Sequence, residues 1–237
     1  MLIKRLRQSV VCGAMAMMLA VPAQAESERP EVDPWQGFNR AMFTFNEQLD
    51  KYALKPAAQG YRFIMPDLAE RGVDNFFSNI GDIGSVVNNL LQGKIDDALT
   101  GVGRIVFNST FGLAGFIDVA TPMGLEPKSE DFGQTLGYWG MPSGPYLVLP
   151  LLGPSTVRDG IGLVPDMALD PIDQVDHVPT RNSLYGLKLL DARAQLLKAE
   201  QIISGDRYIF VRDAYLQRRE YLVNDGEVEV RYDDSDF

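Results

Sequence analysis

The sequence has very few residues of the types that bind metals or form disulfides. Its 237 residues include one cysteine and one histidine. The cysteine, Cys12, lies in an N-terminal segment that we expect to be removed, which would leave no disulfide, cysteine nucleophile or thiolate metal site in the mature chain. The single histidine, His177, argues against a histidine-ligated metal site and a histidine general base.

Motifs for catalysis and nucleotide binding are also missing. The chain has no Gly-x-Ser-x-Gly elbow, no Walker loop and no His-Glu-x-x-His helix. Glu130 and Asp131 could form a carboxylate pair, but adjacent residues seldom converge on one bond, so we expect them to cap or anchor the following loop. Asp170, Asp173 and Asp176 lack the spacing of a calcium loop and indicate an acidic connector. We predict no catalytic residues, no metal and no cofactor.

The N-terminus has the organisation of a secretory signal peptide. Lys4, Arg5 and Arg7 precede an apolar stretch, Val10 to Val21, which is followed by Ala23-Gln24-Ala25. About a dozen apolar residues are too few to cross a bilayer as a helix, which needs ~20. We therefore predict that residues 1–25 are a signal peptide, cleaved after Ala25 on export from the cytoplasm.

The mature chain is predicted to have neither a lipid anchor nor a basic surface. Cys12 follows Ser9-Val10-Val11 inside the apolar stretch, whereas a bacterial lipidation site has a leucine followed by small residues. Three of the 22 basic residues and none of the 32 acidic residues precede Glu26, so the mature chain has a net charge of −13. This charge argues against binding to nucleic acid and against electrostatic attraction to anionic lipid. Any membrane contact must then be apolar.

The mature chain is organised as one domain with short polar ends. We predict a lead-in at 26–34, a helical domain at 35–223 and an acidic tail at 224–237. Apolar residues at helical spacing predict a first helix that starts near Asp33 and ends at Lys55-Pro56, and further helices at about 67–92, 94–107, 183–203 and 206–223. Gly81 and Gly84 are expected to mark a bend, a break or a close helix crossing.

Between the predicted helices, the sequence shows no regular spacing of apolar residues. Residues 108–154 are rich in glycine and proline yet apolar, so they must pack under other elements or contact lipid. Tyr146 to Leu152 has the composition of a strand, and 166–180 that of an acidic, proline-containing connector. On the outer faces of the last two helices we expect the arginines Arg193, Arg207, Arg212, Arg218 and Arg219.

Four ordered stretches resemble the MlaA family, also called VacJ, the outer-membrane component of a Gram-negative phospholipid-transport system. They are residues 33–46, which begin DPWQGFNR; 75–93, which end NNLLQG; 104–118; and 130–158, which contain DFGQTLG and GPY. The resemblance runs from Asp33 to about Leu222. Family members are described as lipoproteins, from which this chain departs by lacking a lipidation cysteine.

The resemblance implies an all-α, ring-like protein on the periplasmic face of the outer membrane, with amphipathic helices around a central amphipathic channel. Phospholipids misplaced in the outer leaflet would pass through the channel to a soluble periplasmic phospholipid carrier, and a trimeric porin would be the membrane partner. This activity would maintain the lipid asymmetry of the outer membrane.

A lipid channel in a membrane needs polar residues inside and apolar residues outside. We predict channel positions among polar residues of the apolar motifs, each of which could instead cap a helix or turn: Asn46, Asn88, Asn89, Asn108, Ser109 and Thr110. The membrane-facing residues are predicted to be Phe76, Phe77, Ile80 and Leu90. In the resembling family a mobile loop borders the channel, so we expect a hinged, gating hairpin or else a rigid turn at Gly140, Pro142, Ser143, Gly144 and Pro145.

Two other functions are open at this point. A porin-associated scaffold would share every feature except dependence of lipid flux on the protein. A periplasmic lipid hydrolase would need Ser109 or Ser155 to be activated by His177, the one histidine of the chain.

Overall fold

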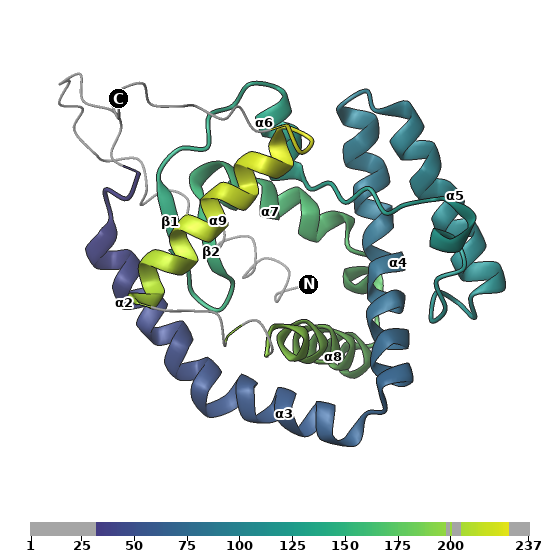
Figure 1. The fold of residues 1–237 in the computed structure, drawn as a ribbon, viewed down its shortest axis with the longest axis horizontal. Helices are drawn as coiled ribbons and strands as arrows, with labels where there is room; N and C mark the ends of the chain where they lie inside the picture. Colours follow the sequence, from purple (N-terminus) through teal and green to yellow (C-terminus); the bar gives the residue numbers. More distant parts are fainter. Residues whose placement is uncertain (1–31, 198–199, 201–204, 228–237) are drawn as a thin grey trace, which may run out of the picture. The chain divides into compact units, whose positions relative to one another are not determined.

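The computed structural model describes residues 32–197, 200 and 205–227. The predicted signal peptide, most of the lead-in and most of the acidic tail lie outside this part of the chain. Helices dominate the described residues, and the two short strands form one hairpin (Figure 1). The predicted all-α class is therefore confirmed.

The first helix continues beyond its predicted end at Lys55-Pro56. α2 (Gln36–Leu49), the π-helical turn η1 (Asp50–Leu54) and α3 (Lys55–Ile64) follow one another without a break. Proline lacks an N–H and its ring collides with the preceding turn of a regular α-helix. The wider π turn changes the spacing of the preceding carbonyls, and Pro56 then occupies the first turn of α3, where no N–H is required.

α4 (Asp67–Leu91) and α5 (Ile95–Phe111) lie close to the predicted ranges 67–92 and 94–107, and the two helices pack against each other. α4 is continuous, so Gly81 and Gly84 do not break it. The close approach lies at Gly101 on α5, where an added Cβ would come within 2.6 Å of Val86. A buried ion pair between Arg104 Nε and Asp82 Oδ2, 3.1 Å apart, joins the same two helices.

The predicted irregular region contains a β-hairpin between two helices. α6 (Phe132–Tyr138) precedes β1 (Tyr146–Leu149), which pairs antiparallel with β2 (Gly153–Thr156). Pro150 lies in the turn, outside the ladder, whereas Pro154 lies within β2 opposite Val148, which a two-stranded sheet with only edge strands allows. α7 (Val157–Leu169) follows directly and was not predicted, because its glycines and the internal Pro165 hide the helical period.

The two C-terminal helices were both predicted, unlike α7. α8 (Val178–Leu196) starts about five residues before its predicted start, with Pro179 in its first turn. α9 (Arg207–Val223) begins after Asp206, whose side chain accepts hydrogen bonds from the N–H groups of Tyr208 and Ile209. The remaining short helices are η2 (Thr121–Met123) and η3 (Pro171–Gln174).

The contacts between neighbouring elements close on themselves. α2 contacts β1, β1 pairs with β2, and β2 contacts α9; α9 contacts α6, α6 contacts α4, and α4 contacts α8; α8 packs on α3, which leads back to α2 through η1. Figure 1 shows α8 beside α3, and α9 across the hairpin. Elements far apart in the sequence are therefore linked in one closed sequence of contacts.

Within residues 32–197 and 205–227, two separate clusters of buried apolar side chains join the elements of this circuit. Val73, Phe77 and Ile172 form one cluster between α4, α8 and η3. Tyr146, Val148 and Tyr208 form the other between α2, the hairpin and α9. Over the described residues, none of the helices combines the length and apolarity needed to cross a membrane.

Candidate functional site

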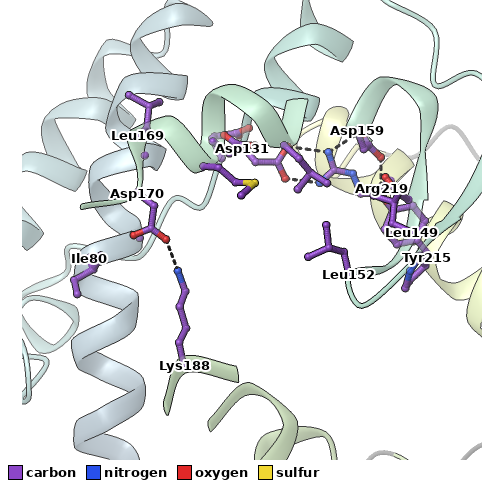
Figure 2. A pocket seen from close by; sticks show the side chains of 18 of the residues that line it. Ile80, Asp131, Leu149, Leu152, Asp159, Leu169, Asp170, Lys188, Tyr215 and Arg219 are labelled. Atoms are coloured by element: carbon purple, nitrogen blue, oxygen red, sulfur yellow. Dashed lines mark hydrogen bonds and ion pairs between the residues drawn. The ribbon is translucent and has the colours of Figure 1, made fainter. Parts of the chain in front are cut away.

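The main candidate site is a cavity of about 490 Å³ to which most members of the contact circuit contribute (Figure 2). Part of its lining is apolar: Ile80, Leu149, Leu152, Pro154, Leu163, Met167, Leu169 and Pro171. The other part is charged: Glu130, Asp131, Asp159, Asp166, Asp170, Lys188 and Arg219. An amphipathic molecule with a charged head and apolar chains matches a cavity of this composition.

Arg219 of α9 is the centre of an ion network on one wall of the cavity. Its Nη2 lies 2.9 Å from Asp131 Oδ1 and 2.9 Å from Asp159 Oδ1. Tyr215, one turn earlier, donates its hydroxyl to Asp159 Oδ2 at 2.8 Å. Burial opposes ionisation of Asp131, but the hydrogen bonds and charge of Arg219 hold the pKa of that carboxyl below its usual range. The network joins α6, α7 and α9.

The expectation that the arginines lie on outer faces holds for Arg207 and Arg218, which are exposed, and is wrong for the other three. Arg219 has an 11 % exposed side chain, and Arg193 pairs with Asp50 and Glu200 in a similarly buried position. Arg212 approaches the buried Asp33 at 3.6 Å. Guanidinium groups can be buried when carboxylates pair with them, and the sequence of one helix does not show the carboxylates of another.

Asp131 confirms the alternative in which this carboxylate has a capping role. Its side chain accepts a hydrogen bond of 2.8 Å from the N–H of Gln134 and so caps α6. Asp170, one of the acids of the predicted connector, caps η3 and also holds Lys188 of α8 at 2.9 Å. Lys188 therefore reaches the cavity from a different helix than Arg219 (Figure 2).

Asp166 of α7 differs from the other acids of the cavity. It accepts hydrogen bonds from the N–H of Phe132, at 3.0 and 3.2 Å, and a long one of 3.5 Å from Asn88. Burial raises the pKa of the Asp166 carboxyl to about 6, and the nearby charge of Asp131 adds to the rise. The ionised form is thus costly in this position.

Replacing Asp166 with asparagine is expected to stabilise the protein at neutral pH. Because the pKa of Asp166 is higher in the folded state than the unfolded value of about 3.9, its ionisation lowers stability as pH rises from about 4 to 6. Asparagine keeps a hydrogen-bond acceptor for the N–H of Phe132 but carries no charge. The free energy of unfolding should therefore increase by an amount on the order of 1 kcal/mol at pH 7.5, and the increase should vanish near pH 4. Thermal melts at both pH values measure it; equal gains at both would contradict the assignment to Asp166 ionisation.

Asn46 is the one predicted channel residue that lines a described cavity. A second cavity, also about 490 Å³, lies beside α2, η1 and α9, and shares Pro154 with the first. Asn46 donates to the carbonyl of Leu149 at 2.9 Å and accepts from the N–H of Leu151 at 2.8 Å. Its amide therefore holds the end of β1 and the hairpin turn against α2.

The other five predicted channel residues make structural contacts or lie at the surface. Asn88 and Asn89 are buried in α4 and bond to Thr135 and to the carbonyl of Lys128. Asn108 accepts from the N–H groups of Val119 and Ala120. Ser109 accepts from Asn79, and both Ser109 and Thr110 are exposed. The two described cavities take none of the five into their linings, so a channel role for them stays a prediction.

The predicted gating segment is the base of the hairpin, and not its tip. The carbonyls of Ser143 and Pro145 accept hydrogen bonds from the N–H groups of Arg158 and Val157, which hold this segment against the start of α7. Gly140 has a φ of +89° because it ends α6: its N–H bonds to Gly137 and the next N–H to Leu136. The rigid-turn alternative therefore accounts for the positive φ of Gly140, and no motion of this segment is needed to explain it. The same segment also contains Pro142 and Gly144.

The predicted membrane-facing residues divide between interior and surface. Phe77 is 7 % exposed and lies in the α4 cluster, where Phe76 and Ile80 pack against it. Ile80 also lines the cavity. Leu90 is 52 % exposed. The large exposed apolar side chains of this region lie mainly along α5: Ile95, Leu99, Val102, Val106 and Phe111.

The residues that a lipid hydrolase would need make other contacts. His177 Nδ1 lies 2.8 Å from Thr180 Oγ1. Ser155 donates to the carbonyl of Thr156, and Ser109 bonds to Asn79. In the described chain these hydrogen bonds place neither serine with the histidine.

Known proteins match almost the whole chain. The sequence model of the family described as "MlaA lipoprotein" matches residues 31–222. "Intermembrane phospholipid transport system lipoprotein MlaA" of Shigella flexneri is 34 % identical over 95 % of this chain and 92 % of its own. The protein of the same description in Haemophilus influenzae is 35 % identical over 83 % of this chain and 81 % of its own. A solved structure from work described as "Structural basis for maintenance of bacterial outer membrane lipid asymmetry" has 35 % identity and a TM-score of 0.72, and covers 82 % of this chain and 100 % of that one.

Proposed function

The chain belongs to the MlaA family, and from this premise we propose that it removes mislocalised phospholipids from the outer leaflet of the outer membrane and so maintains lipid asymmetry. The lipid passes through a channel enclosed by the circuit of contacts from α2 to α9. The amphipathic cavity carries this proposal, because its apolar and charged walls come from α4, α7, α8, α9 and the hairpin.

The hairpin is the proposed gate of the channel. Leu149, Leu152 and Pro154 at its turn line the first cavity, and Pro154 also lines the second. The turn thus lies between two cavities that together would form the route. Leu151 has a φ of +67°, a conformation that a leucine adopts only under constraint, and the hydrogen bond from its N–H to Asn46 supplies that constraint.

The location and partners are those of a peripheral envelope component. The protein lies on the periplasmic face of the outer membrane, held by exposed apolar side chains such as those along α5. Burial of a few hundred Å² of apolar surface is worth several kcal/mol at about 25 cal/mol per Å². A trimeric porin supports it there, and a soluble periplasmic phospholipid carrier receives the lipid.

Lipid extraction from the purified, detergent-solubilised protein tests the function. We expect intact phospholipid to co-purify with the wild-type chain. Lysophospholipid would instead favour a hydrolase, and the absence of lipid would favour a scaffold. Leu152→Asp, which places a charge on the apolar wall, should lower the amount of bound lipid, whereas Leu196→Asp on the exposed part of α8 serves as a control that should not.

The mature protein is expected to begin at Glu26 and to carry no acyl chain, because Cys12 lies within the apolar stretch of the signal peptide. Intact-mass spectrometry of protein extracted from membranes measures this directly. A mass heavier by a diacylglyceryl group, or retention of Cys12, would contradict it. Cys12→Ser should leave localisation unchanged.

A further inference from the structure

The carboxylates of the cavity are matched by basic residues, with one exception. Glu130 pairs with Lys94 at 3.0 Å, Asp170 with Lys188 at 2.9 Å, and Arg219 bridges Asp131 and Asp159, the latter also held by Arg158 at 3.1 Å. The fifth carboxylate, Asp166, has no basic side chain in contact within the described part of the chain. The cavity therefore keeps one uncompensated negative charge.

Asp166 retains capacity to accept further hydrogen bonds. A carboxylate offers about four acceptor positions, and the N–H of Phe132 and the long contact from Asn88 leave part of them free. The charged groups that face it are Asp131, which disfavours its ionisation, and Arg219, which favours it. A cation entering the cavity would offset the cost of this buried charge.

Lys188 offers the opposite charge on another wall of the cavity. Its ammonium has three donors, and Asp170 uses one of them. The side chain is 39 % exposed and reaches toward the cavity from α8 (Figure 2). Asp166 belongs to α7. An incoming phosphate can therefore share Lys188 with Asp170.

We propose that the cavity prefers phospholipids whose head group carries a primary ammonium, with Asp166 accepting the ammonium and Lys188 contacting the phosphate. The inference rests on the proposed transport function and adds the head-group class. A zwitterionic ethanolamine head presents both charges, each with a matching side chain. An anionic glycerol head presents the phosphate but leaves Asp166 without a partner, and so forgoes a charge-assisted hydrogen bond.

Competition between lipids that differ only in the head group tests the preference. The purified full chain is equilibrated with mixed micelles containing equal amounts of phosphatidylethanolamine, phosphatidylglycerol and N-acetyl-phosphatidylethanolamine of the same acyl chains, and the retained lipids are quantified by mass spectrometry. We expect roughly tenfold enrichment of the free amine over both other lipids, the size of one charge-assisted hydrogen bond. The acetylated lipid isolates the ammonium, and this comparison needs no variant.

Variants assign the preference to its residues. Asp166→Asn should bring the enrichment close to unity, and Lys188→Gln should lower the retention of all three lipids. Asp176→Asn removes the same charge at an exposed position and should change nothing. Lipid binding without head-group preference, or preference that survives in Asp166→Asn, would overturn this inference and leave transport standing. Failure of the wild-type chain to bind any phospholipid would overturn the proposed function as well.

Discussion

Arg219→Met should lower the free energy of unfolding by about 2 kcal/mol, less than for a fully buried ion pair because the side chain of its partner Asp131 is 38 % exposed; this corresponds to a fall in the melting temperature of roughly 6 °C for a domain of this size. The arginine bridges Asp131 and Asp159, which is 7 % exposed, and methionine fills similar volume without the charge. Asp159 keeps Arg158, but Asp131 loses its basic partner. An unpaired carboxylate at the junction of three helices is the main source of the expected loss.

Arg218→Met is the matched control for this substitution. Arg218 is the preceding residue of α9 and is exposed, so its replacement should change stability by less than about 0.5 kcal/mol. Thermal melts followed by circular dichroism in detergent compare the two variants. Adding Asp131→Asn to Arg219→Met should recover part of the loss, because the remaining charge is then removed. Equal stability of the Arg218 and Arg219 variants would show that the network contributes nothing.

The pH dependence of the Arg219 effect has a definite sign. The folded state lowers the pKa of Asp131, so the stability contributed by this pair is present above the unfolded pKa of about 3.9 and is lost as pH falls further. The difference between wild type and Arg219→Met should therefore narrow below about pH 4. Asp166 acts in the opposite direction between about pH 4 and 6, and Asp166→Asn should be used as the background for this titration.

Sequence patterns predicted the helices whose own residues contain both the signal for the start of the helix and the apolar stripe that it buries. α4 and α9 appear at nearly their predicted residues, since each combines an apolar stripe with a clear start signal. α7 was missed because glycine and proline interrupt its period, although Thr156 caps it and α6 and the hairpin pack against it. The break expected at Pro56 failed because the preceding π turn has no recognisable pattern in one sequence.

The candidate site was less predictable, because its chemistry depends on partners from distant parts of the chain. Asp131 is 88 residues from Arg219, and Asp170 is 18 residues from Lys188. A single sequence showed these groups only as a helix cap, a surface arginine and a connector. The predicted asparagines were polar residues in apolar motifs, and burial of Asn88 and Asn108 against backbone groups explains their environment without a channel. Asn46 was predicted for the channel, and its contact with the hairpin turn could not be seen in sequence.

The gate is best tested at the hairpin turn rather than at its base. Gly140 and Gly144 have φ values of +89° and +69°, and a Cβ at Gly144 would also come within 3.2 Å of Val157. Side chains there would strain the static structure by about 1 kcal/mol or more at each position, so loss of function could reflect folding alone. The turn held by Asn46 offers a test that leaves these glycines in place.

Crosslinking the turn to α2 should abolish lipid transport. The side chain of Asn46 lies 2.8 Å from the backbone N–H of Leu151, so residues 46 and 151 are neighbours across α2 and the turn. A disulfide between Asn46→Cys and Leu151→Cys would tie the turn to α2, in a chain whose only natural cysteine is Cys12. In the oxidising periplasm the disulfide should pin the turn, and cells should show the deletion phenotype: phospholipid in the outer leaflet and sensitivity to detergent with chelator. Reductant, or either single cysteine variant, should restore transport, since the turn is then free. Normal lipid asymmetry in cells whose protein is fully crosslinked, as judged by a gel shift, would show that the hairpin is a static part of the wall.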